Sequence, residues 1–155
     1  MKLAEPNNDF EEKILKNVKK HGYQLNGIVG SEGGEPPFMY SVGFWVTFGH
    51  PEIIIVGLHS DTAIRIFGMI NEHLKEGGQH FEQDEIYAEF IEGYECGFIN
   101  VIPDKIKEYL LSSCWLYGEN SFPALQLVFQ DENHLWPWDD EASDQFVWNQ
   151  PLLGD

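Results

Sequence analysis

The chain has 155 residues, of which 26 are acidic and 9 are Lys or Arg, so its formal net charge is −17. Phosphate backbones and anionic membranes would be repelled by such a chain, which argues against direct nucleic-acid binding and against a membrane-bound protein. A hydrophobic fraction of 43% and an aromatic fraction of 14% are typical of a globular protein. The length predicts one domain over residues 1–155.

The first half of the chain alternates helix and strand patterns. Polar residues that can cap a helix precede an apolar stripe at helical spacing, and His21-Gly22 ends it. Residues 38–48 alternate so that Phe38, Tyr40 and Val42 share one face with later apolar residues, which predicts a single core-facing strand. The expected elements are a helix at about 8–21, a strand at 23–30, a loop at 31–37, and a hairpin of strands 38–48 and 52–58 that turns at 49–51.

The second half contains the clearest helix, residues 59–78, capped at Ser60 or Asp61 and stopped by a glycine pair. A hairpin at 86–103 that turns near Gly93-Tyr94, a helix at 105–117 and a strand at 124–130 complete a body that runs from 23 to 130. The tail, 131–155, holds too many aromatic residues for a flexible linker, so we expect an irregular segment packed on the body. The pattern predicts an α+β fold: about six strands in an antiparallel sheet or partly open barrel, with about three helices.

Features that bear on location agree with one another. The N-terminus lacks an apolar core of signal-peptide length, and no apolar run has the length of a spanning helix. Cys96 and Cys114 lie far apart without metal-like spacing, which favours reduced, buried thiols. We therefore expect a cytoplasmic protein.

Motifs for catalysis and metal binding are not recognisable. The six His residues form no helical His-Glu-His motif and no Cys/His cluster, no Ser lies in a nucleophile elbow, and no phosphate-binding glycine loop follows a strand. We therefore assign no catalytic residue and no metal ligand, and the sequence leaves any cofactor unknown.

A ligand site is best sought where the strand at 52–58 ends and the next helix begins. Amide groups at a helix start can hold an anion or the polar edge of a ring, and His59 could add a donor. The alternative is an ordinary capped helix. The predicted ligand-binding residues, drawn from this helix start and from the strands before it, are Tyr40, Ser41, Trp45, His50, His59, Ser60 and Arg65.

The tail provides a candidate interface. Residues 131–155 contain seven acids and no Lys or Arg. A basic protein would be attracted to such a surface, although simple solubility also explains it. Exposed aromatic residues are natural anchors for a partner. The predicted interface residues are Trp136, Trp138, Asp139, Asp140 and Trp148; a homo-oligomer is left open.

A specific combination of residues runs through the chain: Tyr40, Gly43, Gly49-His50-Pro51-Glu52, Gly57-Leu58, Gln126, Asp131, Pro137-Trp138 and Gln150-Pro151. With this combination, nearly the whole chain, from about residue 10 to 154, resembles an uncharacterised bacterial family, domain of unknown function four-two-six-two. One departure is Gln130, where that family tends to have proline before the Asp. The resemblance implies no catalytic residue, because no activity is attached to the family.

The sequence leaves two main functions open, and a third, a metal-dependent hydrolase, only if the protein holds stoichiometric zinc or manganese. The favoured hypothesis is an acidic cytosolic protein-binding domain, in one form an immunity-type inhibitor of a basic toxin or effector. The alternative is a small-molecule or cofactor-binding domain, including an oxidoreductase, because a tight hairpin followed by a capped helix is similar to the opening of flavin-binding split barrels. That analogy concerns the fold alone.

Overall fold

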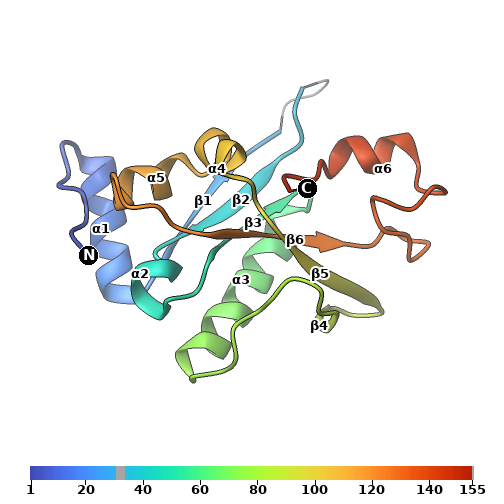
Figure 1. The fold of residues 1–155 in the computed structure, drawn as a ribbon, viewed down its shortest axis with the longest axis horizontal. Helices are drawn as coiled ribbons and strands as arrows, with labels where there is room; N and C mark the ends of the chain where they lie inside the picture. Colours follow the sequence, from blue (N-terminus) through green and yellow to red (C-terminus); the bar gives the residue numbers. More distant parts are fainter. Residues whose placement is uncertain (31–33, 155) are drawn as a thin grey trace.

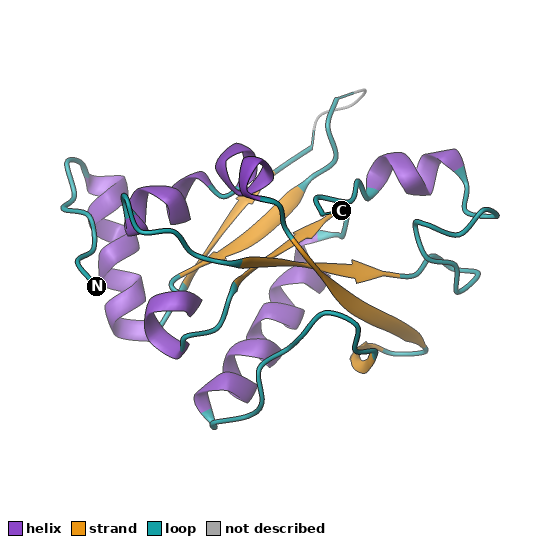
Figure 2. Ribbon diagram, in the orientation of Figure 1, coloured by secondary structure: helices purple, strands orange, loops and turns teal. Residues whose placement is uncertain are grey.

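The computed structural model describes residues 1–30 and 34–154. These residues form six helices and six strands. Figure 1 shows the helices arranged around one sheet, and Figure 2 distinguishes the strands from the helices by colour. In chain order they are α1 Asp9–His21, β1 Gln24–Ile28, β2 Phe38–Val42, α2 Phe44–Phe48, β3 Glu52–Val56, α3 Ser60–Lys75, β4 Tyr87–Ile91, β5 Tyr94–Asn100, α4 Pro103–Tyr109, α5 Leu111–Tyr117, β6 Ala124–Phe129 and α6 Asp144–Asn149.

The sheet is open and mixed. Its strand order is β1-β2-β3-β6-β5-β4, and β3 and β6 run parallel while the other neighbours are antiparallel. The expected antiparallel sheet or partly open barrel with about three helices is therefore wrong, since the described chain has six helices. The reason is that α3 and the β4–β5 hairpin separate β3 from β6 along the chain. Local hairpin patterns carry no information on that long-range pairing.

Helices or aromatic loops cover both faces of the sheet. One face packs against α3, whose Ile66, Phe67 and Ile70 are fully buried with Ile53 and Ile55 of β3. The other face packs against α1, α4 and α5. This explains the near-continuous apolar run of β3, because a strand buried on both faces needs no polar alternation. Among the described residues, no helix has both the length and the apolarity to cross a membrane.

The predicted strand 38–48 is wrong beyond Val42. Gly43 adopts a positive φ of 118°, and Phe44–Phe48 form the short helix α2. A Cβ at position 43 would lie 2.9 Å from the carbonyl oxygen of Gly22, so the end of α1 leaves room only for glycine. Phe44 and Phe48 also have the i, i+4 spacing of a helix, and their ring centroids lie 6.0 Å apart. The alternating pattern was compatible with both structures.

Other sequence predictions were partly right. The helices at about 8–21 and 59–78 and the hairpin turn near Gly93-Tyr94 are confirmed as α1, α3 and the β4–β5 connection. The helix expected at 105–117 is instead two short helices, α4 and α5, which meet at Leu110. Residues 31–33 of the loop expected at 31–37 lie outside the described residues, and so does Asp155 at the end of the expected tail.

Two buried glutamines attach the tail to the sheet. The side-chain amide of Gln150 donates to the carbonyl oxygen of Phe129 and accepts from its N–H, at 3.0 and 2.9 Å. Gln126 does the same to the tail, donating to Pro151 O at 2.9 Å and accepting from Leu153 N at 2.8 Å. Each side-chain amide pairs with a backbone C=O and a backbone N–H, as a neighbouring strand would. Gln150 thus satisfies backbone groups at the end of β6, and Gln126 satisfies backbone groups of the tail. The expectation of an irregular tail is wrong for Asp144–Asn149, which form the helix α6.

Candidate functional site: a cavity between the β1–β2 loop and α6

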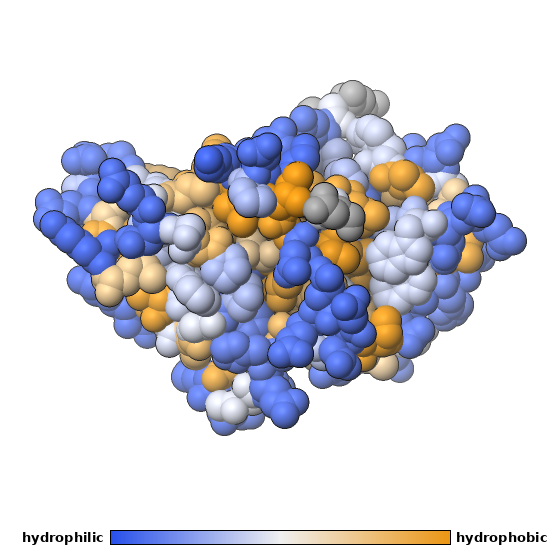
Figure 3. All heavy atoms as spheres, viewed as in Figure 1, coloured by the Kyte–Doolittle hydropathy of each residue, from blue (hydrophilic) through white to orange (hydrophobic). Residues whose placement is uncertain are grey.

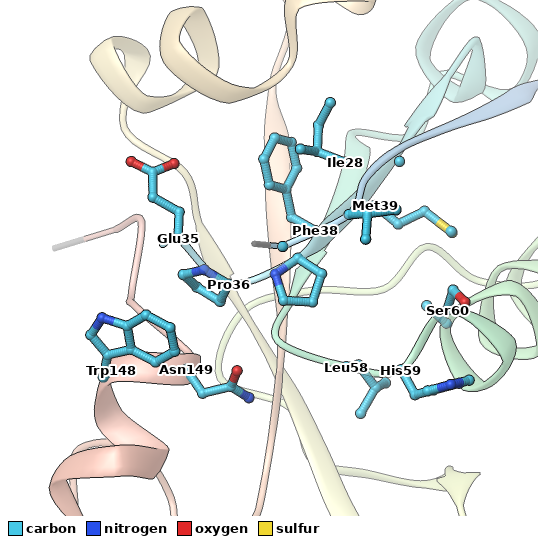
Figure 4. Close-up of a pocket in the computed structure, with 15 residues that line it drawn as sticks. Ile28, Glu35, Pro36, Phe38, Met39, Leu58, His59, Ser60, Trp148 and Asn149 are labelled. Carbon is cyan, nitrogen blue, oxygen red and sulfur yellow. The ribbon is translucent and has the colours of Figure 1, made fainter. Parts of the chain in front are cut away.

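A largely apolar cavity of about 700 Å³ opens where the tail meets the body. Figure 4 shows side chains from three segments around it: the β1–β2 loop with the start of β2, the connection from β3 to α3, and α6. Pro36, Phe38, Met39, Leu58 and Trp148 supply most of its apolar wall. We call it the α6 cavity. Its volume and lining are typical of a binding site in a protein.

The chain holds the walls of the α6 cavity in fixed positions. Asn149 donates from Nδ2 to the carbonyl oxygen of Gly57 at 2.8 Å, which ties α6 to the end of β3. Gly57 has a φ of 88°, and a Cβ at this position would overlap the backbone of Asn149. On the opposite side, His59 caps α3 by accepting from Asp61 N at 3.2 Å. The cap is therefore His59, one residue before the predicted Ser60 or Asp61.

The predicted ligand-binding residues are divided between this cavity and the interior. Only His59 and Ser60 line the cavity. Arg65 is exposed one turn further along α3, where it donates to Met69 Sδ at 3.4 Å. Tyr40 is buried and accepts from Ser112 N at 3.0 Å, while Trp45 is half-buried against the core on the face of α1 and α5. The remaining two, Ser41 and His50, are fully buried.

Figure 3 shows apolar residues gathered in the middle of the viewed face, between α4 and α6, with hydrophilic residues around them.

The predicted interface residues lie toward the edge of the molecule that carries the tail. Trp136 and Trp138 stack on each other, and Asp140 is exposed. Asp139 is half-buried and accepts from Trp136 N at 2.7 Å, so its carboxylate supports the local turn. Trp148 lines the α6 cavity instead.

Glu52 is a fully buried carboxyl group that the sequence analysis named in the family resemblance but did not assign to a site. Its Oε1 accepts from Ser41 Oγ at 2.7 Å and Phe44 N at 3.0 Å, and its Oε2 accepts from Gly43 N at 3.0 Å and Trp45 N at 3.2 Å. Tyr117 also donates to Oε2. The carboxyl therefore satisfies the free amides at the start of α2 and closes the turn after β2. The available signal was an acid placed at the start of the buried run Glu52–Val56.

Burial raises the pKa of the Glu52 carboxyl, while the hydrogen bonds from Tyr117, Ser41 and the amides of Trp45 and Gly43 act in the opposite direction. Burial and the neighbouring Glu52 raise the pKa of the Tyr117 hydroxyl. Because the hydrogen-bonding capacity of Glu52 is filled by groups of the protein itself, its role is to fix α2 and β3 relative to α5.

His50 is buried in a second hydrogen-bonded position. Its Nδ1 donates to Pro51 O at 2.7 Å, and its Nε2 accepts from Phe81 N at 3.0 Å, so the ring is neutral with the proton on Nδ1. Burial lowers its pKa to about 4; the bond to Pro51 acts the other way, and the nearby His80 and His73 lower it further.

The His50 geometry predicts a loss of stability in mild acid. The unfolded ring binds a proton near its usual pKa of 6.5, whereas the folded ring stays neutral until about pH 4. Protonation of His50 therefore favours the unfolded state. The free energy of unfolding of the protein should fall by about 2 kcal/mol between pH 7 and pH 5. Urea unfolding at these two pH values measures the loss. The His50→Gln variant, which cannot titrate, should lack this part of the slope; equal slopes in both proteins would contradict it.

Two neighbouring histidines and one buried thiol are further groups that could react. In the part of the chain that the structure describes, no three His, Cys, Asp or Glu side chains are grouped so as to hold a metal ion. His73 and His80 border a polar cavity, where His73 Nε2 lies 2.7 Å from Gln79 O. Burial raises the pKa of the Cys96 thiol to about 12, so that thiol is unreactive near neutral pH.

The comparison with protein families gives a match over residues 17–143, to the family described as Domain of unknown function (DUF4262). The chain belongs to this family. The match spans the sheet, Glu52, His50 and the Trp136–Trp138 segment, whereas α6 and the residues from Gln150 onward lie beyond it. Trp148 and Asn149, which close the α6 cavity, are therefore features of this chain outside the region matched to DUF4262.

Comparisons with individual proteins add little to the family assignment. None of the curated proteins matches the chain. A crystal structure of a SUFU (suppressor of fused protein) homolog from Neisseria gonorrhoeae FA 1090 is similar with a TM-score of 0.43 and 13% sequence identity, over 81% of this chain and 79% of that one. A similarity this weak supports no statement about function.

Proposed function

We propose that the chain binds a basic protein partner and that an apolar side chain of this partner enters the α6 cavity. The observation that carries the proposal is an open apolar cavity whose rim exposes large apolar side chains. Ile28 is 55% exposed, Val29 is 91% exposed and Trp148 is 48% exposed, and all three line the cavity. Apolar side chains grouped around an opening are typical of a surface that a partner covers.

The charge of the chain supports a basic partner. Among the residues that the structure describes, no Lys or Arg lines the α6 cavity, and Glu35 is part of its wall. A neighbouring cavity of about 640 Å³, which shares Leu58 and Asn149 with it, is lined by Asp131, Glu132 and Glu141. Within residues 1–30 and 34–154, the one salt bridge between a Lys or Arg and an acid is Lys105–Glu108. The many remaining acids leave a negative field that would attract and orient a basic protein.

An acidic inhibitor of the immunity type, which blocks a basic toxin or effector in the cytoplasm, is the form of this function that we favour. Such a protein needs a rigid, charge-complementary surface more than a reaction centre. The two glutamine pairs that hold the tail supply the rigidity, because they fix α6 before any partner arrives. A wall fixed in advance lowers the entropic cost of association.

A small apolar ligand is the second candidate, because the same cavity has the volume of a ligand pocket and carries the polar groups of His59, Ser60 and Asn149 near its apolar walls. A flavin is disfavoured as this ligand. The split-barrel analogy fails for an open sheet, and a phosphate would meet Glu35 without a Lys or Arg in the lining.

Native mass spectrometry of the protein purified from its host separates the two candidates. We expect a complex with a protein of basic isoelectric point that dissociates as the salt concentration rises. A complex whose added mass is that of a small molecule would support the second candidate instead. A chain that carries neither, in low salt and at high concentration, would contradict both.

Trp148→Ala should weaken binding of the recovered partner by about tenfold or more, because it removes a half-exposed indole from the cavity wall. Isothermal titration calorimetry measures the change. Leu111→Ala is the matched control: Leu111 is 62% exposed on α5 and does not line the cavity. Equal affinities of the two variants would show that the partner binds elsewhere.

A further inference from the structure

Trp136 and Trp138 form a stacked pair on the edge of the sheet that holds β4 and β5. Their ring centroids lie 5.0 Å apart and their planes differ by 6°. The indole of Trp136 lies over Gly97 of β5, where a Cβ would meet it at 3.9 Å. One face of Trp138 is covered by Trp136, but its side chain is still 51% exposed. The outer indole therefore presents aromatic surface to solvent.

The orientation of this pair is fixed by its own turn. Trp136 N donates to Asp139 Oδ2 at 2.7 Å, and Asp139 N donates back to Trp136 O at 3.0 Å. Pro137, which separates the two tryptophans in the sequence, is buried. Trp138 thus does not need to be ordered by a ligand, and a ligand that contacts it avoids that entropic cost.

A cleft of about 330 Å³ lies against the two indoles. Its other wall is the segment before β4, which contributes the exposed acids Asp84 and Glu85. The sequence has no Lys or Arg between residues 76 and 104 or after residue 107. In the described part of the chain neither acid belongs to an ion pair. An aromatic surface and two exposed acidic residues therefore border one small space.

The geometry points to this cleft as the binding site for an arginine side chain of the basic partner. An indole face attracts a cation, and the planar guanidinium stacks on it while its N–H groups donate to carboxylates. A lysine ammonium is more strongly hydrated and cannot stack, so it should bind less well. An anion would be repelled by both acids. The assignment of the arginine to a protein rests on the function proposed above.

The test uses the intact chain with hexaarginine and hexalysine peptides as probes. Calorimetry should show tighter binding of hexaarginine by about threefold, the size expected for one exposed cation–π contact. In ¹⁵N-resolved spectra the indole N–H resonances of Trp136 and Trp138 should shift with hexaarginine, whereas that of Trp148 should not. Trp138→Ala should remove most of the preference for arginine, and Asp84→Asn with Glu85→Gln should weaken both peptides.

Phe10→Ala, which removes a 60% exposed aromatic residue on α1, is the control for the aromatic contribution and should keep the preference for arginine. Equal affinity for the two peptides, with unmoved Trp138 resonances, would overturn the inference and leave only a diffuse acidic surface. The outcomes also separate this site from the proposed function. If hexaarginine binds at Trp138 but native mass spectrometry recovers no protein partner, the cleft binds arginine and the proposed function is contradicted. If a partner is recovered and its affinity is unchanged by Trp138→Ala, the proposed function stands and the partner does not use the cleft.

Discussion

Glu52→Gln should lower the free energy of unfolding by about 3 kcal/mol, one of the two largest effects expected for a single substitution in this chain. Both carboxyl oxygens accept hydrogen bonds from at least two groups: Oε1 from Ser41 Oγ and Phe44 N, and Oε2 from the amides of Gly43 and Trp45 and from Tyr117. Glutamine offers one acceptor oxygen, so its amide nitrogen must face donors that it cannot satisfy. Urea unfolding monitored by circular dichroism measures the loss.

The control for this substitution is Glu108→Gln, which makes the same chemical change in an exposed side chain paired with Lys105. It should cost less than 1 kcal/mol, as is usual for a surface pair. Because α2 depends on Glu52 for three of its first amides, Glu52→Gln should also speed hydrogen exchange in residues 43–48. A loss below about 1 kcal/mol with unchanged exchange would show that the network around Glu52 is not essential for the turn.

The sequence predicted the elements whose signal is local. The helical stripe and caps of α1 and α3 and the turn at Gly93 depend on residues a few positions apart, and the sequence located them to within a few residues. It could not predict α2, because the start of this helix is stabilised by a carboxyl that comes after it in the chain and by Tyr117, which is 65 residues from Glu52. The period-2 alternation of residues 38–48 therefore predicted a strand, and no local signal for a helix start opposed that prediction.

The candidate site was less accessible to sequence reasoning than the helices. His59 and Ser60 were found because a helix start follows a strand, which is a local pattern. Trp148 could be named as an exposed aromatic, but its position across the cavity from Met39 depends on the pairing of Gln150 with Phe129 and of Gln126 with the tail. Such amide–backbone pairs join distant segments and leave no periodic trace. Ser41 and Trp45, predicted as ligand-binding residues, are likewise withdrawn from a ligand by packing that only the tertiary structure reveals: Ser41 is buried and Trp45 is half-buried.

Gly57→Ala should both destabilise the protein and open the α6 cavity. The backbone at position 57 has a φ of 88°, and an added Cβ would overlap the carbonyl group of Asn149, so α6 must shift away from β3. We expect a loss of about 3 kcal/mol, part from the left-handed backbone and the larger part from the overlap. Hydrogen exchange should accelerate in α6, and partner binding through Trp148 should weaken in parallel. Gly77→Ala isolates the backbone contribution, because Gly77 has a φ of 80° but nothing within 4 Å of an added Cβ; it should cost only about 1 kcal/mol. Equal losses in the two variants, with α6 exchange unchanged, would mean that the contact between Gly57 and Asn149 does not hold the cavity wall in place.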